Sequence, residues 1–198
     1  MNELWLPPVS LEGAIGSPTV AHVDDDGIYV GYGQAFNRYN LDGTQQTHLI
    51  NAQNNVMAIH SDGDLLLLNH TSGLYARFLS IDKDTNTVID TIESYVDSVY
   101  DSSIAPEKNR IFGRTQGISP SDITYISYDD QGNFSASVDS PYHGDYPSVS
   151  ETWVFPSGSK VVDDSGTIYS TDSLTRLGSF GTRIGDIGFF AGEIPIIL

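Results

Sequence analysis

The sequence predicts an all-β chain built from repeated units of four short strands, and three observations lead to this class. Short runs rich in β-branched and aromatic residues, such as GIYVGYG, DLLLLNH and DITYISYDD, are separated at close intervals by Gly, Asp, Asn, Ser and Pro. No window carries the apolar spacing of a sustained amphipathic helix. Turn-forming sequences of two kinds also recur along the chain, which indicates internal repetition.

The two series of turns define the repeating unit. The first series consists of LDG at 41–43, KDTN at 83–86, DDQG at 129–132 and TDS at 171–173. Their spacing is about 42 to 46 residues, which is the length of one four-stranded propeller blade. The second series consists of DDDG at 24–27, SDGD at 61–64, PEKN at 106–109 and PSGS at 156–159. Strand-forming runs flank every turn, so each unit contains two hairpins joined by a loop.

The ends of the chain predict how the array is completed. DIGFFAGEIPIIL at 186–198 has the pattern of a first hairpin, and residues 3–16 can be aligned with the second hairpin at 168–181. We therefore expect a single β-propeller-like domain over residues 1–198, with about five short blades and the last blade shared between the two termini. Such closure removes exposed sheet edges. The alternative is an open fragment of a larger propeller, whose edge at 194–198 pairs with another chain.

The charge balance restricts the partners that the chain is expected to bind. There are 26 acidic residues against 9 Lys and Arg, which gives a formal net charge of -17, and cysteine is absent. We expect no nucleic-acid partner, because phosphate binding requires a basic face and the cations here are scattered. No apolar run is long enough to insert into a membrane, and no signal peptide is visible at the N-terminus.

Several repeats resemble a known family. LSIDKDTNTVIDTI at 79–92 is similar to the repeat of the YVTN-type bacterial propellers, and SPSDITYISYDDQGN and WVFPSGSKVV resemble repeats of bacterial surface and secreted propeller proteins. The resemblance implies a β-propeller located outside the cytoplasm, either extracellular, at the cell surface or periplasmic. It also implies a role in binding or scaffolding rather than in chemistry, although a fold alone does not define a function.

The candidate ligand-binding face is the one opposite the two series of turns. It includes the loops at 31–35, 69–73, 95–98, 115–122 and 139–148, because these connect the hairpins within a unit or one unit to the next. The candidate ligand-binding residues are Tyr32, His70, Tyr142, His143, Asp145 and Tyr146. Stacking rings beside an imidazole and a carboxylate suit a sugar ring or a peptide. In the alternative, the tyrosines of the 139–148 loop pack between blades.

Residues 82–93, DKDTNTVIDTIE, raise the question of a calcium site. Their oxygen-bearing side chains follow the ligand spacing of an EF-hand, but Thr87 stands where the loop needs Gly and strand-forming residues follow it. The turn series predicts a hairpin here instead. Within that hairpin, Asp82, Asp84 and Asn86 could hold a calcium ion, and we expect no other cofactor and no tight metal site.

Three functions are compatible with these features. The first is a non-enzymatic binding or interaction module outside the cytoplasm, with a protein or carbohydrate ligand. The second is a glycan-active hydrolase or lyase that uses two carboxylates of the ligand face, drawn from Asp97, Asp122, Asp139, Asp145 and Asp186, with Glu193 less well placed in a turn. The third is a structural unit that forms homo-oligomers through open blade edges.

Overall fold

The computed structural model describes residues 8–52, 55–72, 75–94, 102–115, 121–147, 149–190 and 192–198. It confirms an all-β chain of repeated antiparallel sheets: four sheets have four strands each, and a fifth has two. In the four-stranded sheets, neighbours in the sequence are also neighbours in the sheet. This simple order follows from the short connections, because a few residues can join only adjacent antiparallel strands.

The strand boundaries follow the two predicted series of turns. The first sheet contains β1 (Val20–Asp24), β2 (Gly27–Tyr32), β3 (Ala35–Tyr39) and β4 (Gln45–Asn51). The second contains β5 (Val56–Asp62), β6 (Leu65–Ser72), β7 (Tyr75–Asp82) and β8 (Thr87–Ser94). The third contains β9 (Ser103–Ala105), β10 (Arg110–Arg114), β11 (Ile123–Ser127) and β12 (Val138–Asp139), and a single 3-10 turn, η1 (Pro106–Lys108), joins β9 to β10.

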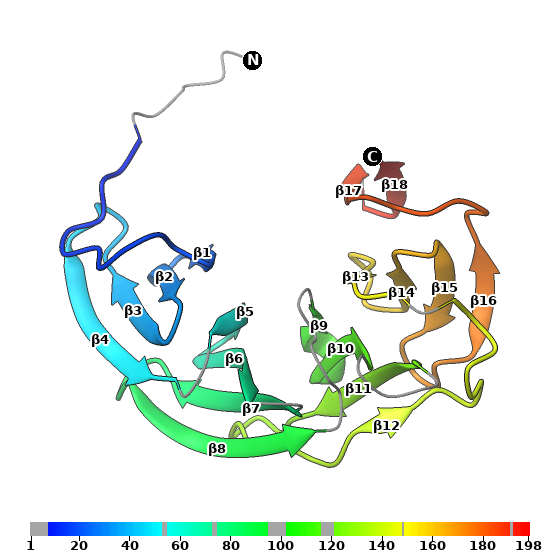
Figure 1. Cartoon of the computed structure of the whole chain (residues 1–198), viewed down its shortest axis with the longest axis horizontal. Helices are drawn as coiled ribbons and strands as arrows, with labels where there is room; N and C mark the ends of the chain where they lie inside the picture. Colours follow the sequence, from blue (N-terminus) through cyan, green and yellow to red (C-terminus); the bar gives the residue numbers. More distant parts are fainter. Residues whose placement is uncertain are drawn as a thin grey trace.

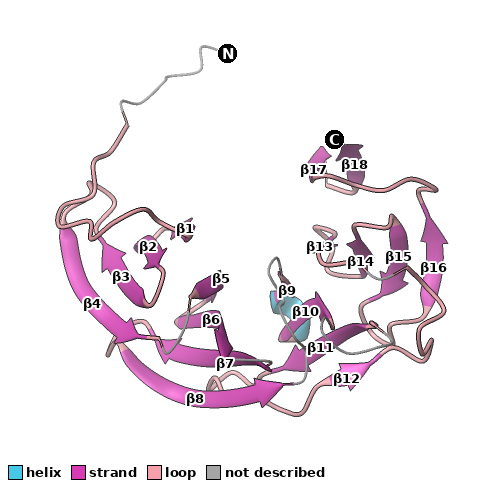
Figure 2. Cartoon of the chain, in the orientation of Figure 1, coloured by secondary structure: helices cyan, strands magenta, loops and turns pink. Residues whose placement is uncertain are grey.

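The fourth and fifth sheets complete the described chain. The fourth contains β13 (Thr152–Val154), β14 (Lys160–Asp163), β15 (Thr167–Ser170) and β16 (Arg176–Ser179). The fifth is the hairpin of β17 (Ile187–Phe190) and β18 (Ile194–Ile197). Figure 1 shows the five sheets side by side along an arc, with the first strand of each four-stranded sheet on the inner side and the last on the outer side. Figure 2 shows the same arrangement coloured by structure type.

Apolar side chains fill the space between successive sheets. One cluster, which includes Phe36, Leu66 and Ile81, joins the first sheet to the second. Equivalent clusters join the second sheet to the third, the third to the fourth, and the fourth to the terminal hairpin. Each inner sheet is therefore buried on both faces. This explains continuous apolar runs such as Leu65 to Leu68, which would not suit a sheet with one face in water.

The fifth blade was expected to be shared between residues 3–16 and the C-terminal hairpin; residues 3–7 lie outside the described residues, and the described remainder does not form it. β18 is paired with β17 alone, and in Figure 1 this hairpin lies at the far end of the arc from the N-terminal segment. Residues 8–16 instead run beside the first sheet. There Glu12 N–H donates to Gly43 O at 2.9 Å, and Leu11 packs against a cluster that contains Tyr39. Contacts with its nearest sheet hold this segment.

The stretch at 82–93 forms the predicted hairpin, with β7 and β8 joined by a tight turn at 83–86. Asp82 accepts hydrogen bonds from the backbone N–H and the hydroxyl of Thr85, at 2.7 and 2.8 Å. These bonds lower the pKa of Asp82. Asn86 has a left-handed backbone, with φ of 56°, which Asn tolerates better than most residues. The carboxylate of Asp82 thus stabilises the turn.

Candidate functional site

Both series of turns lie at the same end of the sheets, because each strand reverses the direction of the one before it. We call this end the turn face. Hydrogen bonds across it join neighbouring sheets: Arg38 of β3 donates to Lys83 O at 2.7 Å, and Arg110 of β10 donates to Asp172 O at 3.0 Å. The turns are consequently held at fixed positions relative to one another, which is what a preformed site requires.

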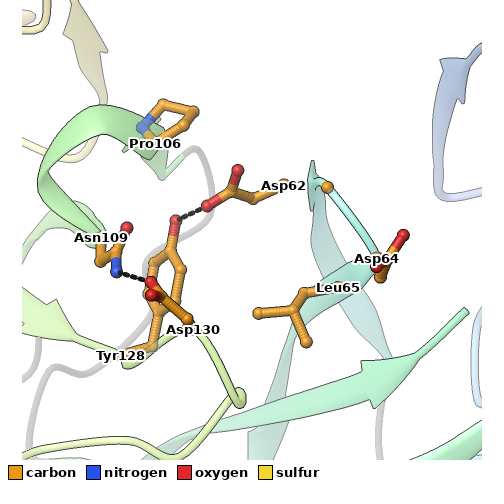
Figure 3. Close-up of a pocket in the computed structure, with 8 residues that line it drawn as sticks. Asp62, Asp64, Leu65, Pro106, Asn109, Tyr128 and Asp130 are labelled. Carbon is orange, nitrogen blue, oxygen red and sulfur yellow. Dashed lines mark hydrogen bonds between the residues drawn. The ribbon is translucent and has the colours of Figure 1, made fainter.

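A pocket of about 240 Å³ opens on the turn face between the second and third sheets. Its lining comes from three turns and from the ends of β5 and β6, and consists of Asp62, Gly63, Asp64, Leu65, Pro106, Asn109, Tyr128 and Asp130. Figure 3 shows the Tyr128 hydroxyl directed at Asp62 and the Asn109 side chain directed at Asp130. We call this the acidic pocket. Its volume suits a single side chain or a small head group better than a larger ligand.

Local turn chemistry sets the lining side chains in place. Asn109 has a left-handed backbone that ends the 3-10 turn, and its side-chain N–H donates to Asp130 at 2.9 Å. Asp129, next in the chain to Asp130, accepts backbone N–H groups of Gln131 and Asn133 at 3.0 and 2.8 Å. The turn that carries Asp130 is thus fixed by its own hydrogen bonds.

Tyr128 and Asp62 form the central polar contact of the acidic pocket. The Tyr128 hydroxyl donates to Asp62 Oδ2 at 2.7 Å, and Tyr128 is only 4% exposed. Burial and the Asp62 carboxylate raise the pKa of Tyr128 well above its ordinary value, so the hydroxyl remains a donor at neutral pH. The second oxygen of Asp62 accepts no hydrogen bond from the residues that the structure describes, and is therefore available to a ligand.

A second pocket of about 230 Å³ lies between the first and second sheets. It is more apolar, and its lining consists of Ile50, Asn51, Ala52, His70, Arg77, Leu79, Val88 and Thr91. His70, one of the predicted ligand-binding residues, is buried here in β6. Arg77 forms an ion pair with Glu93 beside it.

The other predicted ligand-binding residues do not meet in one place. Tyr32 is buried within the first sheet, where its hydroxyl oxygen accepts a hydrogen bond from Tyr39 at 3.1 Å. In the 139–148 loop, Tyr146 packs edge-to-face on Tyr142 and on Tyr169 of β15, with ring centroids 5.2 and 5.9 Å apart. Both loop tyrosines contact the core cluster between the third and fourth sheets. The structure thus shows the packing role that the sequence offered as the alternative.

His143 and Asp145 belong to the same loop but extend toward solvent. The His143 side chain is 86% exposed, and its Nδ1 lies 3.6 Å from Asp122 Oδ2. Asp122 is itself buried and accepts the backbone N–H of Gly144 at 3.0 Å. Asp145 is exposed. These residues form an exposed polar edge, while the six predicted ligand-binding residues are distributed over three different parts of the fold.

The remaining predicted carboxylates are also dispersed. Asp139 is exposed on β12, and Asp186 is exposed before β17. Glu193 lies in the β17–β18 turn, where it accepts the backbone N–H of Ser157 at 2.8 Å. Asp97 lies outside the described residues. The catalytic hypothesis therefore stays a prediction.

No group of three or more His, Cys, Asp or Glu side chains is arranged to hold a metal ion in the part that the structure describes, which includes Asp82, Asp84 and Asn86. Within the same ranges, no helix has the length and apolar character needed to cross a bilayer.

Fold and site together define an all-β repeat protein with a preformed acidic pocket between two of its sheets. No protein-family model matches the chain, and a search of curated proteins finds no significant match. The resemblance to YVTN-type propellers therefore stays a prediction from the turn and strand sequences.

The acidic pocket was not among the sites predicted from the sequence. Its residues lie in the turns, whereas we expected ligands on the opposite face, where longer loops are found. A comparison of equivalent turns in the sequence could have indicated this pocket. Asp130 occupies the place in its turn that Lys83 occupies in the preceding unit, so an acidic residue stands where the other turn has a basic one.

Proposed function

We propose that the chain is a non-enzymatic binding module of β-propeller type that works outside the cytoplasm. The acidic pocket is its contact site, and a protein or peptide is its ligand. One observation carries the proposal: polar side chains from separate turns converge on a preformed pocket whose size matches one side chain. The five sheets along an arc and the blade-length repeats support the propeller-type assignment.

The proposal can be tested with a ligand screen that monitors the residues of the acidic pocket. We would titrate the protein with a panel of short peptides and oligosaccharides and follow backbone amide shifts by NMR. We expect the shifts to centre on Asp62, Tyr128 and Asp130, and Tyr128→Phe to weaken binding because it removes the donor to Asp62. Asp25→Asn serves as the control, since Asp25 is exposed in the β1–β2 turn, away from the pocket. Release of reducing sugar from the oligosaccharides would favour the enzymatic alternative, and an unperturbed pocket across the panel would refute the proposal.

A second function is favoured by the terminal hairpin. Ile187, Phe189 and Ile197 pack on the core toward the fourth sheet, while the outward side chains of Phe190, Ile194, Ile196 and Leu198 are between 52% and 77% exposed. A sheet that is apolar on both faces is typical of one packed on both sides, as the inner sheets of this chain are. The corresponding proposal is self-association through this face. Light scattering would show a mass that rises with concentration and falls in Ile194→Lys, whereas a monomer at every concentration would exclude it.

A further inference from the structure

The three lysines of the chain each join two neighbouring sheets at the turn face. Lys83 Nζ lies 2.7 Å from Asp24 Oδ2, which ties the second sheet to the first. Lys108 Nζ lies 2.6 Å from Asp172, between the third and fourth sheets. Lys160 Nζ lies 3.3 Å from Glu193, between the fourth sheet and the terminal hairpin. The junction of the second and third sheets is left without a lysine, and this is where the acidic pocket opens.

The occupied junction and the acidic pocket are built from equivalent positions. Asp24 is the last residue of β1 and pairs with Gly27, and Asp62 is the last residue of β5 and pairs with Leu65. Asp24 and Asp62 are therefore equivalent, and so are Asp26 and Asp64, which lie two residues further on. In the turns of the next sheet, Asp82 and Asp129 are equivalent, because each accepts a backbone N–H group of its own turn. The residues that follow them, Lys83 and Asp130, are therefore equivalent too. Asp130 therefore replaces Lys83.

The lysine in the first junction shows what these carboxylates bind. Lys83 is 5% exposed, and its ammonium nitrogen contacts Asp24 at 2.7 Å, Asp26 at 3.1 Å and the hydroxyl of Ser61 at 2.8 Å. Three acceptors satisfy the three N–H donors of a primary ammonium group. The turn face thus already contains one complete ammonium site, and two of its three acceptors, Asp24 and Asp26, have their equivalents, Asp62 and Asp64, in the lining of the acidic pocket.

The charge of the acidic pocket is not balanced within the chain. All nine Lys and Arg residues lie in the described ranges, and none of them lines the pocket. Asp62 accepts a hydrogen bond from the Tyr128 hydroxyl, and Asp130 accepts one from the side-chain amide of Asn109; both donors are neutral. The remaining carboxylate oxygens of Asp62 and Asp130 accept no hydrogen bond from the described residues. A cation held between carboxylates gains charge-assisted hydrogen bonds, about twice as strong as neutral ones.

We propose that the acidic pocket binds a primary ammonium group, seated between Asp62 and Asp130 as Lys83 is seated between Asp24 and Asp26 in the neighbouring junction. This rests on the proposed binding function and specifies the chemistry of its ligand. A lysine side chain of a partner protein and a free polyamine share this group. The lysine side chain is the better fit, because a peptide also contacts the rim of a pocket that holds only one side chain.

The experiment compares a lysine peptide with its acetylated form. Acetyl-Gly-Lys-Gly-amide would be titrated into the protein, and amide shifts of Asp62, Tyr128 and Asp130 would be followed by NMR; the same peptide acetylated on the lysine nitrogen has no charge to offer. We expect binding by the first peptide and at least a tenfold weaker response to the second. Spermidine would be titrated in the same way to test a free polyamine as the ligand. Tighter binding of spermidine than of the peptide would show that the pocket binds polyamines and not a lysine side chain.

Substitutions within the pocket provide the matched controls. Asp130→Lys restores the residue type of the first junction, so its own ammonium should fill the site, abolish peptide binding and raise the thermal unfolding midpoint. Asp25→Lys makes the same charge change in an exposed turn and should leave binding unchanged. An equal response to both peptides, or binding that survives Asp130→Lys, would overturn the ammonium assignment. In that case shifts of the pocket amides by any other ligand would leave the proposed binding function standing.

Discussion

The ammonium group of Lys83 lies 2.7 Å from Asp24 Oδ2, and this contact joins the first sheet to the second. Burial alone would raise the pKa of Asp24, but hydrogen bonds from Lys83, Ser61 and the Asp26 backbone outweigh it and lower the pKa to about 2. For Lys83, burial acts to lower the pKa, and hydrogen bonds with Asp24 and Asp26 raise it overall. Both groups are therefore charged at neutral pH, and each depends on the other.

Removing the Lys83 ammonium should destabilise the chain, because it leaves Asp24 largely buried without its counter-ion. We expect Lys83→Met to lower the free energy of unfolding by about 2 kcal/mol, less than the 3–5 kcal/mol of a fully buried pair, since Asp24 keeps some exposure. Lys108→Met is the matched control and should destabilise the chain less than Lys83→Met does, because its partner Asp172 is 70% exposed. Urea denaturation measures both, and equal losses would contradict the expectation.

Asp24 should also make stability depend on pH in acid. Its pKa is about 2 in the folded chain and 3.8 ordinarily, so between these values the unfolded chain binds more protons. The stabilisation is present above pH 4 and is lost as the pH falls toward 2. Thermal unfolding midpoints from pH 6 to pH 2 should fall less steeply in Asp24→Asn than in the wild type, and parallel curves would show that Asp24 contributes nothing here.

His60 should produce a second pH dependence, closer to neutrality. Its Nε2 lies 2.7 Å from the Ser102 hydroxyl, and burial together with the nearby His22 lowers its pKa from 6.5 to about 4. The unfolded chain therefore binds more protons between these values, so stability is complete above pH 6.5 and declines as the pH falls to 4.

The size of the His60 effect follows from the shift. The full difference between the folded and unfolded pKa of His60 corresponds to roughly 3 kcal/mol of stability. We expect the free energy of unfolding to fall by about 2 kcal/mol between pH 7 and pH 4, because the His60 side chain is only partly buried. His60→Gln, which keeps a hydrogen-bonding side chain at this place, should flatten the dependence between pH 7 and pH 4 in denaturant titrations. An unchanged slope in this variant would assign the dependence to other groups.

The turns could be predicted from the sequence because their chemistry is local. The sequences DKDTN and DDQGN place an Asp where it accepts backbone N–H groups two or three residues on, and such bonds form whatever surrounds the turn. Strand pairing followed from the turns. The shared last blade could not be predicted in the same way, because the position of residues 8–16 depends on distant contacts such as that of Glu12 with Gly43.

The candidate site was harder to predict for a related reason. Tyr142 and Tyr146 have the composition of a binding loop, yet their rings complete the core between the third and fourth sheets. Single-sequence composition does not distinguish these two uses of Tyr. The acidic pocket, in contrast, is formed by residues that look like ordinary turn residues, and only the stacking of the second sheet on the third brings Asp62, Tyr128 and Asp130 together.

The last prediction concerns Arg114 and Asp163, a buried ion pair between the third and fourth sheets. The Arg114 guanidinium lies 3.2 Å from Asp163 Oδ2 and also donates to Ser121 O and Pro147 O, and the two side chains are 1% and 0% exposed. Burial raises the pKa of Asp163, while Ser165 and Arg114 act to lower it. Arg114→Met removes the charge that compensates a fully buried carboxylate, and should cost about 3–5 kcal/mol at neutral pH.

The pH dependence of that variant gives a sharper test than its stability alone. Without Arg114 the pKa of Asp163 rises further above its unfolded value, so the folded chain binds more protons and its stability falls as the pH rises. Arg114→Met should therefore recover part of its loss between pH 8 and pH 5, in urea titrations corrected for the wild-type curve. In the double variant Arg114→Met/Asp163→Asn, which has no carboxylate to protonate, the recovery should disappear. If the single variant loses the same free energy at both pH values, the destabilisation comes from the lost backbone contacts of Arg114 rather than from an uncompensated Asp163.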